Sequence, residues 1–234
     1  MFVTEAPSVC ESLPLSPTPR TTLNRRRDRA GTDRRDLYDV LDAALVCHFG
    51  VLVDGAPLVL PTAFGFDPAG PDDGGTLYLH GSVASLSLVA ARQRPICVTF
   101  TVLDGLVLAR SAFHHSMNYR SAVVMGTPRT VDDPDEKSRA LSLVVDHVVP
   151  GRMETLRPHT RKELAATSVL ALSLAEASVK ARTGDPIDDE SDLQNGGWAG
   201  VIPLRVVADE VVTAADAAGH QPPADVLERA ARLV

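Results

Sequence analysis

The chain has 234 residues, of which 44% are hydrophobic and 23% are charged, an ordinary balance for a globular protein with a sizeable core. A formal net charge of −7 and a pI near 5.5 argue against broad electrostatic attraction to nucleic acid, so we expect no nucleic-acid partner. No apolar run approaches the length of a membrane span, about 18 residues. We therefore expect no membrane partner.

The three cysteines, Cys10, Cys47 and Cys97, are odd in number and include no CxxC pair. This pattern argues against a disulfide framework or a zinc site and fits a reducing compartment. The first residues lack the basic start and apolar core of a secretory signal. We therefore expect a cytoplasmic protein, and the scarcity of lysine relative to arginine hints at a bacterial genome rich in GC.

The N-terminal region begins with residues 1–20, which are rich in Ser, Thr and Pro and predict a disordered tail. Residues 25–35 are rich in arginine, and a nucleic-acid-binding arm is one interpretation. Because aspartates interrupt this run, we favour the solvated start of a helix. The helix itself is predicted over 36–44 by the helical spacing of Leu37, Val40, Leu41 and Ala44.

Short apolar runs separated by turns predict β-structure in the middle of the chain. Asp54-Gly55 and Asp104-Gly105 each divide two such runs, which is a strong hairpin signal. The same patterns predict, in chain order, a loop over 67–75, a buried strand over 76–79, a short helix from Ser82 and a strand over 119–131.

The last third of the chain begins with a helix that Asp133 and Pro134 open. Residues 160–182 are ambiguous, because the first half has helical spacing while the second half alternates, and we expect a strand from about residue 168. Residues 197–207 close the β-structure, and 223–234 predict a terminal helix. About six strands without a βαβ rhythm predict an antiparallel barrel with flanking helices.

Common catalytic and metal-binding motifs are absent from the sequence, which has no nucleophile elbow, phosphate-binding loop or HExxH motif. His114 and His115 are adjacent, and adjacent side chains of a strand point to opposite faces, so they are poor co-ligands for one metal ion. The acidic residues of 188–192 are expected to form a solvated loop. We therefore expect no metal site.

Three other stretches carry groups suited to a ligand. Residues 80–85 end a strand with a bare backbone and begin a helix with hydroxyls, which suits either a capped turn or an anion at a helix N-terminus. Residues 118–121 place several donors at the mouth of a strand, including an arginine fork suited to phosphate. Trp198, the only tryptophan, lies among glycines and is either a core residue or a stacking surface for a planar ligand.

With these stretches in order, the chain resembles the FMN-binding split-barrel family, the pyridoxamine 5′-phosphate oxidase-like proteins, and in particular its nitroimidazole-reductase-like branch. The matching segments, spread over about residues 20–205, are DGAPLVLPTAFGFD, LYLHGSVASLSL, FHHSMNYRSAVVMGTPRTVDDPDEKSRAL, ELAATSVLALSLAEASVKARTGDP and WAGVIPL. The resemblance implies a six-stranded antiparallel split β-barrel over 21–207, followed by a helical extension over 208–234. It also implies a homodimer with two FMN molecules at the subunit interface.

The resemblance further implies which side chains and backbone groups contact FMN. The first group lines the isoalloxazine ring, the second surrounds the phosphate and ribityl chain, and the rest come from later strands. In that order they are Leu60, Pro61, Thr62 and Ala63; His80, Gly81, Ser82 and Ser85; and Asn118, Tyr119, Arg120, Ser121 and Trp198, with Lys180 and Arg182 as further basic candidates.

Two departures separate this chain from true pyridoxamine phosphate oxidases. Val83 and Ala84 stand where those enzymes carry an Arg/Lys pair, and VIPLRVV stands where they carry an Arg-Leu-His stretch. We therefore do not expect oxidation of pyridoxine phosphate. His80 matches a histidine near the flavin of the nitroreductase-like branch, so it is the candidate catalytic residue, unless it is simply hydrogen-bonded at a turn.

Three functional hypotheses follow from the resemblance and the residues. The first is an FMN-dependent oxidoreductase acting on a small (nitro-)aromatic or heterocyclic substrate with NAD(P)H as candidate donor, in which the flavin carries the redox chemistry. The second is a flavin-binding or sensing module without turnover, which the lack of a clear general acid or base favours. The third is a split barrel that binds haem or a deazaflavin, with His80, His114 or His115 as the haem ligand.

Overall fold

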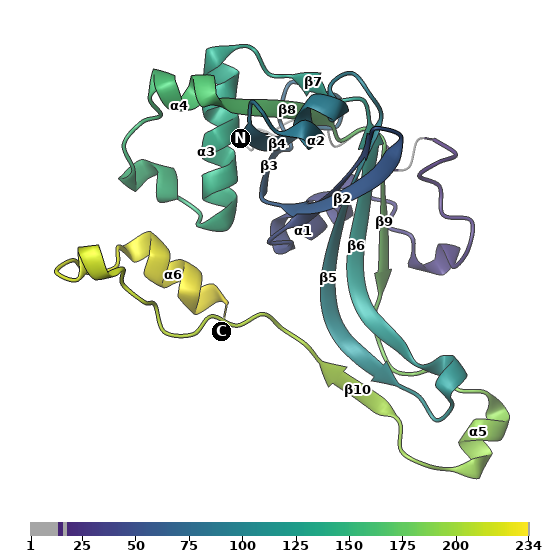
Figure 1. Cartoon of the computed structure of the whole chain (residues 1–234). Coiled ribbons are helices and arrows are strands. Elements are labelled where there is room, and N and C mark those ends of the chain that lie inside the picture. Colours follow the sequence, from purple (N-terminus) through teal and green to yellow (C-terminus); the bar gives the residue numbers. More distant parts are fainter. Residues whose placement is uncertain (1–13, 16–17, 234) are drawn as a thin grey trace, which may run out of the picture.

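The computed structural model describes residues 14–15 and 18–233 and contains two antiparallel sheets (Figure 1). The first sheet has the strand order β2-β1-β5-β6-β9, with β10 paired to β5, and the second has the order β3-β4-β8-β7. The predicted antiparallel barrel with flanking helices is confirmed. The strands are β1 Cys47–Val53, β2 Ala56–Thr62, β3 Phe64–Asp67, β4 Thr76–Ser82, β5 Ile96–Leu108, β6 Ser116–Gly126, β7 Arg129–Thr130, β8 Thr167–Ser173, β9 Ala177–Arg182 and β10 Gly200–Pro203.

Helices flank both sheets. Helix α1 packs against β5, β6 and β9 and buries the apolar stripe predicted from its spacing, while α3 packs against β3, β4 and β8. Asp133 caps α3, and its carboxylate accepts a hydrogen bond from the Glu136 amide at 2.8 Å. The helices are α1 Arg34–Ala43, α2 Leu86–Ala91, α3 Pro134–Val148, α4 Arg161–Ala166, α5 Glu190–Asn195 and α6 Ala224–Arg232.

Strand β4 separates two apolar clusters. Leu77 and Leu79 belong to the main core, which includes residues of α1 and both sheets. Tyr78 points to the opposite face, into a smaller cluster that includes Val131 and Ala140 and lies under α3. His80 follows Tyr78 by two positions and therefore lies on that same face of β4.

The hairpin predicted at Asp104-Gly105 is wrong. Strand β5 runs straight through this dipeptide and shifts register between Leu103 and Gly105, which marks a β-bulge. The bulge turns the Asp104 carboxylate toward the Arg120 guanidinium of β6, with N–O distances of 2.8 and 3.0 Å. The hairpin at Asp54-Gly55 is confirmed, and both residues have positive φ.

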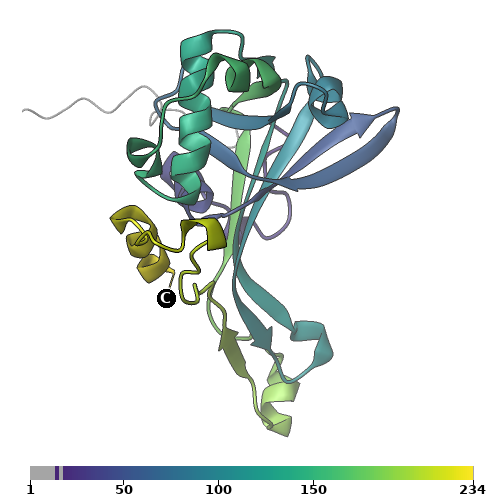
Figure 2. The same cartoon turned by 60° about the vertical axis from the view of Figure 1, so that its left-hand side comes forward.

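The far ends of β5 and β6 form an arm that projects from the barrel (Figures 1 and 2). We define the arm as these strand ends, the connection over 109–115, residues 183–199 with α5, and β10. Within it, β10 pairs with the end of β5, from Gly200 opposite Leu108 to Pro203 opposite Gly105. The long antiparallel ladder of β5 and β6 carries the arm.

The predicted solvated start of α1 is wrong at Arg34. Its side chain is buried, and it donates hydrogen bonds to the carbonyl oxygens of Leu174 at 2.6 Å and Ala175 at 3.3 Å. The tight turn between β8 and β9 directs these carbonyls inward, so a buried guanidinium satisfies them.

The predicted tail over residues 1–20 lies largely outside the described residues. At its end, Thr18 and Arg20 both donate to the Glu176 carboxylate at 2.6 Å. The predicted domain boundaries stay predictions.

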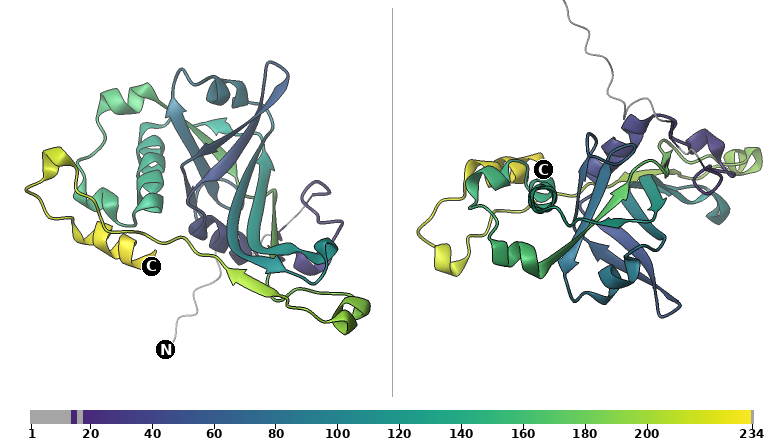
Figure 3. Two further views of the ribbon diagram at one scale, coloured as in Figure 1. Left: turned by 60° about the horizontal axis from the view of Figure 1, so that its bottom comes forward. Right: turned by 90° about the horizontal axis from the view of Figure 1, so that it is seen from above.

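The segment after β10 leaves the arm and returns toward α3, where the predicted terminal helix α6 lies (Figure 3). Arg152 Nη1 lies 3.3 Å from the Asp225 carboxylate and links α6 to the turn after α3. In the part of the chain that the structure describes, no helix has the length and apolar character needed to cross a membrane.

Candidate functional site

The first two groups of predicted site residues lie side by side. Phe64 of β3 pairs with Leu79 of β4, so continuing this antiparallel register sets Ala63 opposite His80. The end of β2, which carries Leu60 to Thr62, therefore meets the end of β4. Residues 60–63 and 80–82 form one candidate flavin-binding edge within a single chain.

The predicted helix start at Ser82 is wrong. Ser82 is the last residue of β4, and α2 begins four residues later with Ser85 as its N-cap residue. The amides expected to face an anion already have acceptors: Val83 donates to the Ala166 carbonyl at 3.2 Å, Ala84 to Ser82 Oγ at 3.3 Å and Ser85 to the Ser82 carbonyl at 2.9 Å. Ser82 therefore makes a local turn instead of capping a helix.

Gly81 allows α2 to approach β4. A Cβ atom at this position would lie 2.9 Å from Leu88 Cδ1 of α2, closer than side chains pack. Helix packing therefore accounts for a glycine here, and its contact with FMN stays a prediction of the resemblance.

His80 is half-buried, and its Nδ1 atom is buried without a hydrogen-bond partner among the described residues. Burial lowers the pKa of its imidazole, so the neutral ring predominates at pH 7. A buried polar atom without a partner costs about 1–3 kcal/mol, so such atoms often mark a functional site. A neutral imidazole can ligate a metal ion.

An exposed apolar surface follows His80 along the chain. Val83 and Val89 are both exposed, and Leu86 at the start of α2 has 75% of its surface exposed. The edge strand β2 likewise exposes Leu58 and Val59. Exposed apolar side chains at this density indicate a surface for an apolar ligand or a protein partner.

The predicted donors on β6 are engaged within the chain. The Arg120 fork is occupied by Asp104, Ser121 Oγ donates to the Lys180 carbonyl at 3.1 Å, and Asn118 Nδ2 donates to the Gly184 carbonyl at 3.1 Å. Arg182 is buried and donates to Asn118 Oδ1 and to two backbone carbonyls. The guanidinium of Arg182 is therefore a structural group.

The β6 donors and Trp198 lie away from His80 within one chain. Thr62, at the end of β2, aligns through Cys47 and Phe100 with Ala122 of β6, three strands away or about 14 Å. Trp198 lies on the arm and is 71% exposed, so it is no core residue. The single chain thus joins the first two predicted groups and leaves Tyr119 to Ser121 and Trp198 apart from them.

A cavity of about 720 Å³ lies elsewhere, between α1, β3 and α3, and contains none of the predicted site residues. Its lining includes Tyr38, Asp42, Phe66 and His147. The His147 ring contacts Phe64 and lies 2.8 Å from the Ala44 carbonyl, so packing and a hydrogen bond account for this histidine.

Residues 33–181 match the family model described as pyridoxamine 5′-phosphate oxidase. The chain belongs to this family. No curated protein matches the chain. A candidate 5-nitroimidazole antibiotic resistance protein from Bacteroides thetaiotaomicron shares the fold, with a TM-score of 0.53 at 23% identity over 64% of this chain and 85% of that one.

Two other solved structures are more similar to this chain than the Bacteroides protein is. The flavocytochrome Anf3 from Azotobacter vinelandii is 38% identical, with a TM-score of 0.82 over 92% of this chain and 98% of that one. An FAD- and haem-binding protein from Mycobacterium smegmatis is 39% identical, with a TM-score of 0.78 over 86% of this chain and 97% of that one. Both similarities extend well beyond the segment that matches the family model.

Proposed function

We propose that this chain is a flavin- and haem-binding redox protein that acts as a homodimer in the cytoplasm. The observation that carries the proposal is its identity of 38% and 39% to two proteins named a flavocytochrome and an FAD- and haem-binding protein. Family resemblance alone implies FMN. We propose FAD, because the relative from Mycobacterium smegmatis is named for it.

His80 is the residue that we propose as a haem ligand. Its buried, unpartnered Nδ1 and neutral ring fit a metal-ligating imidazole, and the apolar surface that follows it fits a macrocycle. The other two candidates lie on the arm, away from this apolar surface. His115 Nδ1 lies 2.8 Å from the Ser111 carbonyl, and His114 Nε2 lies 3.2 Å from the exposed carboxylate of Asp189. Haem, when bound, supplies one-electron chemistry.

The exposed surfaces support a homodimer. Trp198 on the arm is exposed to solvent. It lies close to Leu108 of β5, roughly 25 Å along that strand from Phe100, which aligns with Thr62 of β2. A second copy of the chain would cover the exposed apolar residues of β2 and α2 and bring an arm toward the His80 edge. The nitro-aromatic substrate and the NAD(P)H donor stay predictions of the family resemblance.

The free thiols of Cys47 and Cys97 support the cytoplasmic part of the proposal.

The test is an absorption spectrum of protein purified from haem-supplied cells, followed by chromatography of the flavin released by heat. We expect flavin bands, a Soret band and released FAD. Flavin bands without a Soret band, even after haemin is added, would overturn the haem proposal. Released FMN would overturn the assignment of FAD.

A further inference from the structure

We propose that His114, Asp189 and Asp192 form a binding site for a divalent transition-metal ion at the tip of the arm. One ligand atom from each of the three side chains lies within 4.8 Å of the other two. This site is separate from the flavin and haem proposal. It joins one histidine of the His114-His115 pair to the acidic segment 188–192, two features that the sequence suggests are unrelated.

His114 supplies the nitrogen ligand. It ends a 3₁₀ turn over Ala112–His114, and its Nε2 atom is buried without a hydrogen bond among the described residues. Asp189 Oδ2 lies 3.2 Å from this nitrogen. The adjacent His115 is not one of the three ligands, and its Nδ1 lies 2.8 Å from the Ser111 carbonyl.

The two carboxylates come from the start of α5. Asp189 is the N-cap residue of α5, yet its side chain makes no capping hydrogen bond and turns toward His114 instead. Asp192 follows three residues later, on the same side of the helix. Two carboxylates that face one imidazole repel each other, and a bound cation would relieve this repulsion.

Hydrogen bonds already hold the two halves of this site together. The Asp188 side chain is only 1% exposed and accepts hydrogen bonds from the Arg110 amide at 2.9 Å and from Arg110 Nη1 at 2.8 Å. Arg110 Nε donates to the Gly197 carbonyl at 3.1 Å. The predicted solvated loop is therefore wrong at Asp188, and the arm fixes the segment that carries both ligand carboxylates.

Zinc is the ion to which we commit. Imidazole nitrogen and carboxylate oxygens bind Zn²⁺ at about 2.0–2.2 Å, with water completing the shell. Two atoms bound to one such ion lie at most about 4.4 Å apart, so small side-chain rotations would close the site.

The test is equilibrium dialysis of the untagged holoprotein against Zn²⁺, with the bound metal measured by mass spectrometry. We expect the wild-type chain to bind one Zn²⁺, and His114→Ala and Asp192→Asn each to weaken binding by at least about tenfold. The matched controls are His115→Ala, next to the ligand histidine, and Glu190→Gln, on the same helix. Both controls are expected to bind zinc as the wild type does.

Flavin content and circular dichroism check that each variant is folded. Asp192→Asn preserves the shape of the side chain, so it decides the question if His114→Ala does not fold. The proposal is overturned if the wild-type protein binds no zinc. It is equally overturned if His115→Ala loses as much zinc as His114→Ala, or if Asp192→Asn binds zinc normally.

Discussion

Tyr78 and His80 lie two residues apart on the same face of β4, yet their surroundings differ. The Tyr78 hydroxyl donates to Glu136 Oε1 at 3.0 Å, whereas His80 Nδ1 has no hydrogen-bond partner among the described residues. Burial and the neighbouring Glu136 carboxylate raise the pKa of Tyr78 to about 12. One strand therefore carries a polar group that is fully satisfied beside one that is not.

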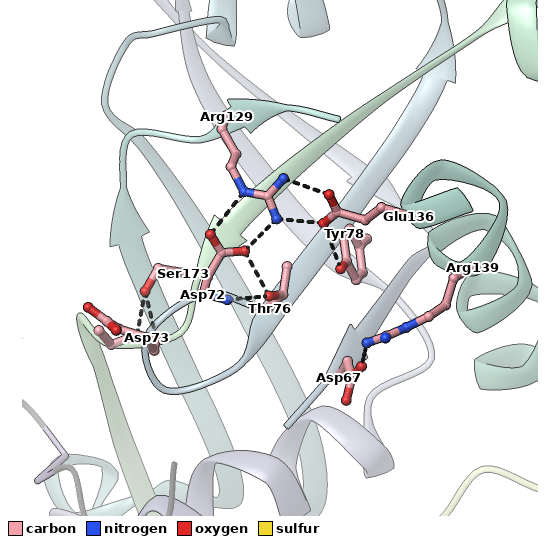
Figure 4. Close-up of polar contacts among 10 residues, drawn as sticks. Asp67, Asp72, Asp73, Thr76, Tyr78, Arg129, Glu136, Arg139 and Ser173 are labelled. Atoms are coloured by element: carbon pink, nitrogen blue, oxygen red, sulfur yellow. Dashed lines mark hydrogen bonds and ion pairs between the residues drawn. The ribbon is translucent and has the colours of Figure 1, made fainter. Parts of the chain in front are cut away.

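The satisfied end of the strand belongs to an ion-pair network around Arg129 (Figure 4). The Arg129 guanidinium donates to Asp72 at 2.9 Å and to Glu136 at 2.5 and 2.9 Å, while Thr76 Oγ1 donates to Asp72 at 2.7 Å. The network joins the loop after β3, strands β4 and β7, and α3. The Arg129 guanidinium pairs with both carboxylates, so the network has a structural role.

His80 shows the opposite arrangement. The strand continues into the turn at Ser82. The hydroxyl and carbonyl oxygens of Ser82 accept hydrogen bonds from the amides of Ala84 and Ser85, and neither is bonded to the His80 imidazole. An unpartnered buried polar atom is costly, and a bound ligand is one way to complete it. The comparison therefore separates groups that hold the fold together from the group that we assign to the cofactor.

The largest loss of stability is expected at Arg129. Arg129→Met leaves the Asp72 and Glu136 carboxylates unpaired in a half-buried site. Because 39% of the Arg129 side chain is exposed, water offsets part of the effect. We expect the free energy of unfolding to fall by about 2 kcal/mol. Breaking a fully buried ion pair would cost more, about 3–5 kcal/mol.

Urea denaturation measures this loss, with Arg139→Met as the control. Arg139 of α3 pairs with Asp67 at the end of β3. Its side chain is more exposed than that of Arg129, so the loss should stay below about 1 kcal/mol. Equal losses for the two variants would show that the Arg129 network contributes nothing special.

A smaller loss is expected at Tyr78. Tyr78→Phe removes the hydroxyl and leaves Glu136 with its Arg129 contacts, so the free energy of unfolding should fall by about 1 kcal/mol. The same urea experiment measures it. An unchanged stability would mean that the hydroxyl is no better satisfied than the His80 ring.

His80 is expected to respond in the opposite direction. In the cofactor-free protein, His80→Leu removes the unpartnered Nδ1, so we expect a gain of about 1 kcal/mol in the free energy of unfolding. His115→Leu is the control, because it breaks the contact with the Ser111 carbonyl and should bring no gain. Destabilisation by His80→Leu would contradict the contrast between the two ends of β4.

The smallest effect is a dependence of stability on pH. Burial holds the pKa of His80 below its unfolded value of about 6.5, so below that pH the unfolded chain takes up a proton that the folded chain does not. Stability of the cofactor-free protein should therefore fall as the pH drops through about 6.5, and less steeply in His80→Leu. Identical pH profiles, measured by thermal unfolding from pH 5 to 8, would remove His80 as a contributor.

Local signals predict much of the fold. The spacing over 36–44, the cap at Asp133 and the turn at Asp54-Gly55 each depend on neighbours in the sequence, and all three are confirmed. Asp104-Gly105 shows the same signal but forms a bulge, because the partner of Asp104 is Arg120 on the next strand. A turn and a bulge use the same dipeptide, and only the distant partner tells them apart.

The site is less predictable for the same reason. The hydroxyls after Gly81 are compatible with a helix cap or a local turn, and the packing of Leu88 on Gly81 accompanies the turn. The pairing of His114 with Asp189 joins residues 75 positions apart, which no spacing rule links. The missing partner of His80 is a property of its surroundings and has no signal in the sequence.

The most direct test of the account is the haem content of His80→Ala, measured beside its flavin content in the purified protein. We predict that haem per chain falls by at least about tenfold while flavin is retained, as expected for loss of an iron ligand. His115→Ala should keep both cofactors. Haem at the wild-type level in His80→Ala would contradict the assignment of His80.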